Sequence, residues 1–175
     1  MTETRHNVRP SNQPAVNIPE QRLQNQHIAR PRRGPAAELV AHLGAVQAQE
    51  YPFAKWALAL RLGRATRDAD IEAALDMGEI LRTHVLRPTW HFVTAADIGW
   101  MLELTAPRVR LAMTHYTGYQ GLNSAMIARA IAIIERVLGR GGFLTRAELG
   151  VALARERFKL TTSQLGLVCM RNWSA

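Results

Sequence analysis

Residues 80–93 interrupt a chain whose other segments carry helical patterns. The first half of this stretch is rich in β-forming residues, Arg87-Pro88 is a turn candidate, and Thr89-Trp90-His91-Phe92-Val93 alternates between polar and apolar side chains. This pattern predicts a β-hairpin. Helices packed in series and followed by one hairpin are typical of a winged helix-turn-helix, so we predict a mainly α fold with a small β-hairpin wing.

Four helices are predicted before the hairpin, from apolar periodicity and from Pro or Gly near their ends. They are expected over residues 21–29, from Pro35 through Leu43, over residues 53–62, and from Asp68 or Asp70 to Gly78. The tryptophans of this region and of the hairpin are expected in the core: Trp56, Trp90 and Trp100.

A second winged-helix unit is predicted to begin beyond the hairpin. Thr94 can cap a helix that Pro107 interrupts, and Asn123 or Ser124 can cap a long amphipathic helix that ends at Gly139. The capping box Thr145-Arg146-Ala147-Glu148 then starts another helix. A last apolar segment follows, so the first unit is expected to be complete and the second to be partial.

These patterns divide the chain into four parts. Residues 1–18 are polar, contain prolines and show no apolar period, so we expect a disordered basic arm. The first winged-helix domain is predicted over residues 19–94, connecting helices over residues 95–122, and the start of a truncated second winged-helix domain over residues 123–175.

The chain has a formal net charge of +8, and Lys55 and Lys159 are the only lysines among its 22 basic residues. The planar guanidinium of arginine matches phosphate and the edge of guanine, which favours double-stranded DNA as the partner. A high-GC genome enriches arginine equally well, and charge alone leaves both explanations open. Arg30, Arg32 and Arg33 belong to a basic N-terminal cluster and are candidate DNA contacts.

Cys169 is the single cysteine, so the chain has neither an internal disulfide nor the cysteines of a zinc site. No apolar run approaches the roughly 20 residues that span a bilayer, and the N-terminus lacks the apolar region of a signal peptide. We therefore expect a cytoplasmic monomer without a metal, a cofactor or a membrane partner.

Gln47 and Gln49 stand one residue apart where the helical pattern breaks off before Pro52. In an extended segment, side chains two residues apart share a face, so the two amides can converge on one ligand. Spacing alone equally fits two solvated loop glutamines.

Five stretches share their order and spacing with a known family: Arg22-Leu23, Gly44-Ala45-Val46-Gln47-Ala48-Gln49, residues 81–93, Asp97-Ile98-Gly99-Trp100 and Leu144-Thr145-Arg146-Ala147-Glu148-Leu149. Over roughly residues 20–170 the chain resembles the tandem winged-helix DNA-binding proteins of the AlkZ/YcaQ type. Members of that family include DNA glycosylases that remove bulky or crosslinking alkyl adducts. Their catalytic element is a glutamine, an apolar residue, then glutamine or aspartate, and Gln47-Ala48-Gln49 matches it residue for residue.

The resemblance implies hydrolysis of the N-glycosidic bond of alkylated purines in DNA repair, with Gln47 and Gln49 as catalytic residues. Alkylation at N3 or N7 makes the base a cationic leaving group that needs no general acid. What remains is to stabilise an oxocarbenium-like sugar and to place a water. We expect the carbonyl oxygen of Gln49 to orient the water and Gln47 to serve in positioning.

The hairpin contributes further candidates. Thr89 and His91 share a face of the strand, and we predict that they support the glutamines or contact DNA, with local hydrogen bonds of His91 as the alternative. Arg82 and Arg87 flank the hairpin and are predicted to contact phosphate. Pairing of these arginines with Asp97 or Glu79 is the other outcome that the sequence allows.

Two alternatives to a glycosylase stay open. The family continues through further winged-helix units, whereas residues 170–175 do not continue its pattern. The chain is then either a non-catalytic DNA-binding or regulatory winged-helix module, or an inactive truncated fragment.

Overall fold

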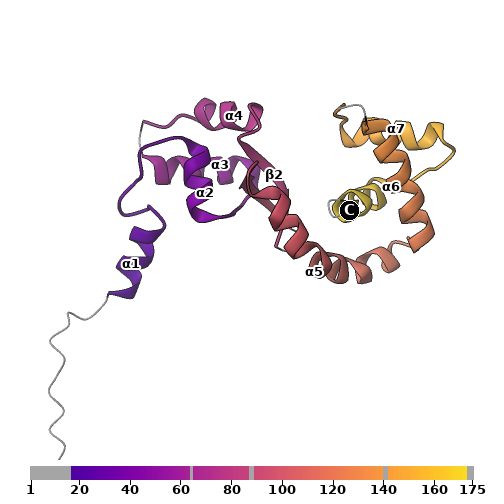
Figure 1. Cartoon of the computed structure of the whole chain (residues 1–175), viewed down its shortest axis with the longest axis horizontal. Coiled ribbons are helices and arrows are strands. Elements are labelled where there is room, and N and C mark those ends of the chain that lie inside the picture. The colour runs from indigo at the N-terminus through magenta and orange to yellow at the C-terminus, as the bar shows by residue number, and fades with distance from the viewer. Residues whose placement is uncertain (1–16, 64, 87–88, 140–141, 173–175) are drawn as a thin grey trace, which may run out of the picture.

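The computed structural model describes residues 17–63, 65–86, 89–139 and 142–172. These residues form a mainly helical chain with one small antiparallel sheet, which confirms the predicted class at that level. Two lobes, residues 36–94 and residues 124–172, lie at opposite ends of the long helix α5 (Ile98–Tyr119), as Figure 1 shows.

The first lobe combines three helices with the sheet around one core. Large side chains from every layer are fully buried there, among them Leu39, Leu58, Ile71 and Phe92. Helix α1 (Ile18–Asn25) precedes the lobe, whose elements are α2 (Ala36–Leu43), β1 (Val46–Gln47), α3 (Tyr51–Leu62), α4 (Asp68–Asp76), β2 (Ile80–His84) and β3 (Trp90–Thr94).

The sheet has the order β1-β3-β2, with all neighbours antiparallel. Strands β2 and β3 are the predicted hairpin, with Thr83 opposite His91 and His84 opposite Trp90. Strand β1 was not predicted, because two residues are too few to show an alternating pattern. It places Gln47 directly opposite His91, so the first glutamine belongs to the sheet.

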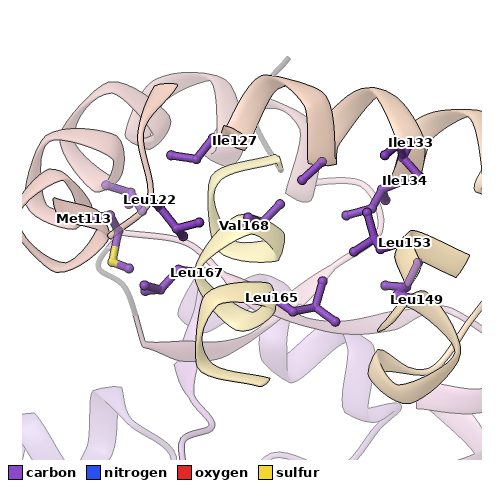
Figure 2. Packing of buried hydrophobic residues seen from close by; sticks show 12 residues of the cluster. Met113, Leu122, Ile127, Ile133, Ile134, Leu149, Leu153, Leu165, Leu167 and Val168 are labelled. Atoms are coloured by element: carbon purple, nitrogen blue, oxygen red, sulfur yellow. The ribbon is translucent and has the colours of Figure 1, made fainter. Parts of the chain in front are cut away.

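The second lobe is helical throughout, with α6 (Ser124–Leu138), α7 (Arg146–Arg155) and α8 (Thr162–Asn172). Helix α8 packs against α5, α6 and α7, and Figure 2 shows its leucines and valine among the aliphatic side chains of the other helices. The predicted caps are present: Asn123 accepts from the Met126 amide at 2.9 Å, and Glu148 accepts from the Thr145 amide at 2.7 Å.

Helix α5 contradicts the expectation that Pro107 interrupts it, because the helix runs unbroken through that residue. Pro107 and Glu103, whose carbonyl loses its helical donor, are both exposed, so water can satisfy that carbonyl. The first half of α5 packs Met101 against Val85 and Val93 of the first lobe. Its second half joins the second core, which makes α5 part of both lobes.

Other expectations need correction. Trp56 and Trp100 are 64% and 52% exposed, so only Trp90 of the three tryptophans packs against a core. The first helix covers residues 18–25 rather than 21–29, because Asn17 caps it by accepting from the Glu20 amide. Most of the predicted basic arm, residues 1–16, lies outside the described residues.

Candidate functional site between the lobes

The segment Gln47-Ala48-Gln49 is held along the edge of β3. Ala48 is fully buried, and its amide donates to the carbonyl of Trp90 at 2.7 Å. After Ala48 the chain bends, and α3 begins two residues beyond Gln49. A buried alanine between two exposed glutamines explains why the middle residue of this segment is small and apolar.

The two glutamines occupy different places at this edge. Gln47 lies opposite His91 in the sheet, whereas Gln49 follows the bend and its Oε1 accepts the backbone N–H of Trp90 at 3.3 Å. This contact directs the amide oxygen of Gln49 toward the strand and uses one of its two lone pairs. The second lone pair and the amide hydrogens of Gln49 have no partner among the described residues.

Arg82 lies beside the same bend. Its Nε donates to the Ala48 carbonyl at 3.0 Å, and its Nη2 donates to the Gln49 carbonyl at 3.1 Å. The guanidinium also lies over the Trp90 ring, with Cζ 4.4 Å from the ring centroid, and over Tyr51 at 5.5 Å. The side chain that was predicted to contact phosphate thus binds the backbone of the glutamine segment.

A charged cluster underlies Tyr51 at the start of α3. The Tyr51 hydroxyl donates to Glu72 at 2.7 Å, while the buried Lys55 donates to Glu72 and, at 2.9 Å, to Asp68. Burial first, and then the hydrogen bond to Glu72, raise the pKa of Tyr51 to about 12. These bonds also raise the pKa of Lys55, so the cluster keeps its charges at neutral pH.

His91 and Thr89 are held locally. His91 is 4% exposed, and its Nδ1 lies 2.9 Å from the Thr89 carbonyl, so Nδ1 carries the proton of this contact. The Thr89 hydroxyl is buried and has no hydrogen-bond partner among the described residues. His91 therefore lies opposite Gln47 in the sheet and is supported by backbone, whereas Thr89 directly precedes β3.

A pocket of about 380 Å³ separates the sheet from the second lobe. Gln49, His84 and Trp90 line its first wall, and the opposite wall includes Arg146, Ser163 and Gly166. Gln47 does not line this pocket. The structure thus brings one of the two predicted glutamines to a hollow that both lobes form.

His84 and Arg146 are the residues of this pocket that sequence reasoning missed. The His84 ring packs on Trp90 with 3.8 Å between centroids, and burial, followed by the charges of Arg82 and Arg146, lowers its pKa to about 4. Arg146 starts α7, and its guanidinium lies close over Gly166 of α8. It has no hydrogen bond or ion pair within the described part of the chain. The capping box placed Arg146 on a helix, but only the packing of α7 on α8 places it opposite Gln49.

The other predicted arginines lie away from this pocket. Arg32 pairs with Glu38 at 3.0 Å, Arg33 lines a separate hollow of about 950 Å³ beside α4, and Arg30 is exposed in the same connection. None of the glutamine-site residues lines that larger hollow. Arg87 lies outside the described residues.

Two further observations concern the described residues only. No three His, Cys, Asp or Glu side chains gather there in a way that would hold a metal ion. None of the described helices combines the length and the hydropathy that a membrane span requires.

Comparison with known proteins identifies the family of this chain. Residues 40–174, more than half of the chain, match the model of the AlkZ-like family, described as DNA glycosylase AlkZ-like. The chain belongs to the AlkZ-like family. Its glutamine segment, its sheet and the pocket-lining part of α7 and α8 all fall within the matched residues.

A solved structure has the same fold. The DNA glycosylase AlkZ of Streptomyces sahachiroi matches with a TM-score of 0.71 at 22% identity, over 87% of this chain and 42% of that one. The chain therefore spans less than half the length of that structure. No curated protein sequence matches this chain.

Proposed function

We propose that this chain binds double-stranded DNA and acts as a DNA N-glycosylase that releases alkylated purines, with Gln47 and Gln49 as its catalytic residues. The proposal rests on the position of the Gln49 side chain. Its amide is held by Trp90 at the mouth of a pocket that faces an unpaired arginine, in a chain of the AlkZ-like family.

The order of elements in the first lobe supports DNA binding by a winged helix. Helix α2, strand β1, helices α3 and α4 and the β2-β3 hairpin follow one another as in that fold. We propose the division into a first winged-helix domain over residues 19–94, connecting residues 95–122, and part of a second such domain over residues 123–175.

The charge of α4 argues against its entering a DNA groove. In a winged helix the second helix of the helix-turn-helix reads the major groove. Here that helix has no basic residue and four acidic ones, Asp68, Asp70, Glu72 and Asp76. Phosphates repel such a helix, so we propose that DNA meets the chain at the side of Gln49 and Arg146.

The proposed reaction does not require a strong general base. A purine alkylated at N3 or N7 leaves as a neutral molecule, and the sugar becomes oxocarbenium-like. The free lone pair of Gln49 Oε1 accepts a hydrogen bond from the attacking water, while Gln47, beside the buried His91, positions the sugar. Two neutral amides suit lesions that are already labile and cationic.

Arg146 supplies the phosphate contact of this proposal. Its guanidinium faces Gln49 across the pocket and has no partner among the described residues. A guanidinium fork binds phosphate with two parallel hydrogen bonds. An anion at this place fits the charges of Arg82 and Arg146, which, after burial, also lower the pKa of His84.

Release of 7-methylguanine from duplex DNA tests the proposal. We expect Gln49→Ala to slow single-turnover release at least about 100-fold, as loss of one preorganised polar group does in other active sites. Gln47→Ala should also slow it, whereas Gln21→Ala, an exposed glutamine of α1, should not. Release by the unaltered chain that is no faster than by the Gln47→Ala, Gln49→Ala double variant would refute the proposal.

A non-catalytic DNA-binding or regulatory module is the second candidate, favoured by the net charge of +8 and the neutrality of both amides. It predicts salt-sensitive binding with no base loss. The same assay, run beside a binding titration in increasing salt, separates the two functions.

A further inference from the structure

We infer that Arg82 is a positioning residue that fixes the orientation of the Gln49 amide, rather than a contact to DNA phosphate. The inference rests on the proposed function in one respect only, the catalytic role of Gln49. That Arg82 holds the backbone of Ala48 and Gln49 is a structural statement, which applies to the folded chain with or without DNA.

The hydrogen bonds of Arg82 fall where the sheet stops holding the chain. Strand β1 ends at Gln47, and the last backbone–backbone bond from the segment to β3 is the one that the Ala48 amide donates to the Trp90 carbonyl. Beyond it, the carbonyls of Ala48 and Gln49 accept from Nε and Nη2 of Arg82. Two donors of one rigid fork on two consecutive carbonyls define the direction of the bend.

Aromatic contacts hold the guanidinium itself in place. It lies over the rings of Trp90 and Tyr51, and Tyr51 is anchored in turn by its hydrogen bond to Glu72. Trp90 also gives its backbone N–H to Gln49 Oε1 and its carbonyl to the Ala48 amide. The Gln49 amide therefore lies within a closed set of contacts, which is formed by Arg82, Trp90 and the Ala48-Gln49 backbone.

Lysine cannot replace arginine in this set. An ammonium group is a compact charge without the planar fork, so it can reach one carbonyl but does not hold two carbonyls and lie flat over a ring together. For a phosphate contact the two side chains differ less, because Lys also binds phosphate as a point charge. Arg82→Lys thus separates the two roles.

The test compares Arg82→Lys and Arg82→Gln with Arg146→Gln in the full chain. With DNA containing 7-methylguanine, we expect both Arg82 variants to lower the single-turnover rate at saturating protein about 10- to 100-fold, since small misplacements have effects of this size. Their Kd for DNA and its salt dependence should stay close to those of the unaltered chain. Arg146→Gln, at the proposed phosphate contact, should instead raise the Kd for DNA and reduce its salt dependence. A weaker, less salt-dependent Kd for Arg82→Gln, with an unchanged rate at saturation for Arg82→Lys, would overturn the inference.

Amide hydrogen exchange gives a readout that needs no activity. In Arg82→Lys we expect the Ala48 amide, which donates to Trp90, to exchange about tenfold faster or more, because the bend is released. The Met77 amide of the same lobe, bonded to Ala73 in α4, should be unaffected and so reports that the lobe stays folded. Unchanged exchange at Ala48 would overturn the inference even if the unaltered chain released no base. Absence of base release with faster Ala48 exchange would instead refute only the proposed function.

Discussion

The two lobes hold their polar groups in different ways. Five of the six buried polar or charged side chains in the described residues belong to the first lobe: Lys55, Thr83, His84, His91 and Thr94. The core of the second lobe is built from aliphatic residues and Met113, with Cys169 and Phe158 at its edge. Burying polar groups is unfavourable unless they are paired, and in the described part of this lobe the Thr83 hydroxyl and His84 Nδ1 are buried without a hydrogen-bond partner.

The helices of the two lobes also begin differently. In the second lobe, a side chain at the start of each helix accepts a hydrogen bond from a backbone amide of the first turn; the acceptors are Asn123, Thr145 and Thr161. In the first lobe, α2 and α3 follow Pro35 and Glu50 without a side-chain cap. Helix α4 of the first lobe does have a local cap, since Asp70 accepts from the Arg67 amide at 2.8 Å, so the contrast concerns α2 and α3, whose starts depend on packing. The sheet positions the Gln49 amide through the backbone of Trp90, and the helical lobe presents the charge of Arg146 to the pocket.

The largest expected effects come from cavities in the two cores. Leu58 and Leu153 are 0% and 1% exposed in the first and second lobes. Each change to alanine should lower the free energy of unfolding by about 2–5 kcal/mol, as measured by urea denaturation. Because α5 packs into both lobes, we expect one shared transition in both variants. Two separate transitions would show that the lobes unfold independently.

The buried His84 makes the first lobe sensitive to acid. Its pKa of about 4 lies below the ordinary value of 6.5, so between these pH values the unfolded chain binds a proton that the folded chain does not. Stability should therefore fall by up to about 3 kcal/mol as the pH drops from about 6.5 to about 4. His84→Phe keeps a ring against Trp90 and should flatten this part of the pH profile in urea midpoints. An equally steep profile in that variant would assign the acid sensitivity to other groups.

Arg146 is expected to affect DNA affinity rather than stability. Arg146→Gln should raise the Kd for duplex DNA about 3- to 10-fold and reduce the slope of log affinity against log salt by about one. Arg155→Gln, an exposed residue at the far end of the same helix, is the matched control. If both variants change the slope equally, the effect belongs to the general charge of the lobe and not to the pocket.

The smallest effect tests local encoding of the second lobe. The hydroxyl of Thr145 accepts from the Glu148 amide at 3.3 Å, and Thr145→Ala should lower stability by about 1 kcal/mol. Pro35→Ala, at a helix start of the first lobe without a side-chain cap, should have no comparable capping effect. A larger loss at Pro35 than at Thr145 in thermal unfolding would contradict the contrast between the lobes.

The elements that sequence predicted best are those with local signals. The β2-β3 hairpin, the Asn123 cap and the Thr145-Glu148 box are all present, because alternation and capping act within a few residues. Strand β1 and the continuity of α5 through Pro107 were missed. Strand β1 exists only through its pairing with β3. The continuity of α5 depends on whether the carbonyl that Pro107 leaves without a helical donor faces water.

In the candidate site, too, the residues with a local motif were predicted and the long-range contacts were not. Gln47 and Gln49 could be named from sequence because their spacing matches a family motif, and their catalytic role stays a prediction. The binding of Arg82 to the Ala48 and Gln49 carbonyls could not be foreseen, since 33 or more residues separate these partners in the chain. An arginine in a hairpin fits phosphate and backbone equally well until the fold places it.

The sequence by itself determined the helical class, the hairpin, the helix caps and the glutamine motif, since periodicity and capping are properties of neighbouring residues. Only the tertiary structure decided that Gln47 enters the sheet while Gln49 faces the second lobe. It also placed Arg146 across the pocket and buried His84 behind Trp90. Gln47 and His91, and Gln49 and Arg146, are far apart in the sequence, and they meet through strand pairing and helix packing, which leave no local pattern in the chain.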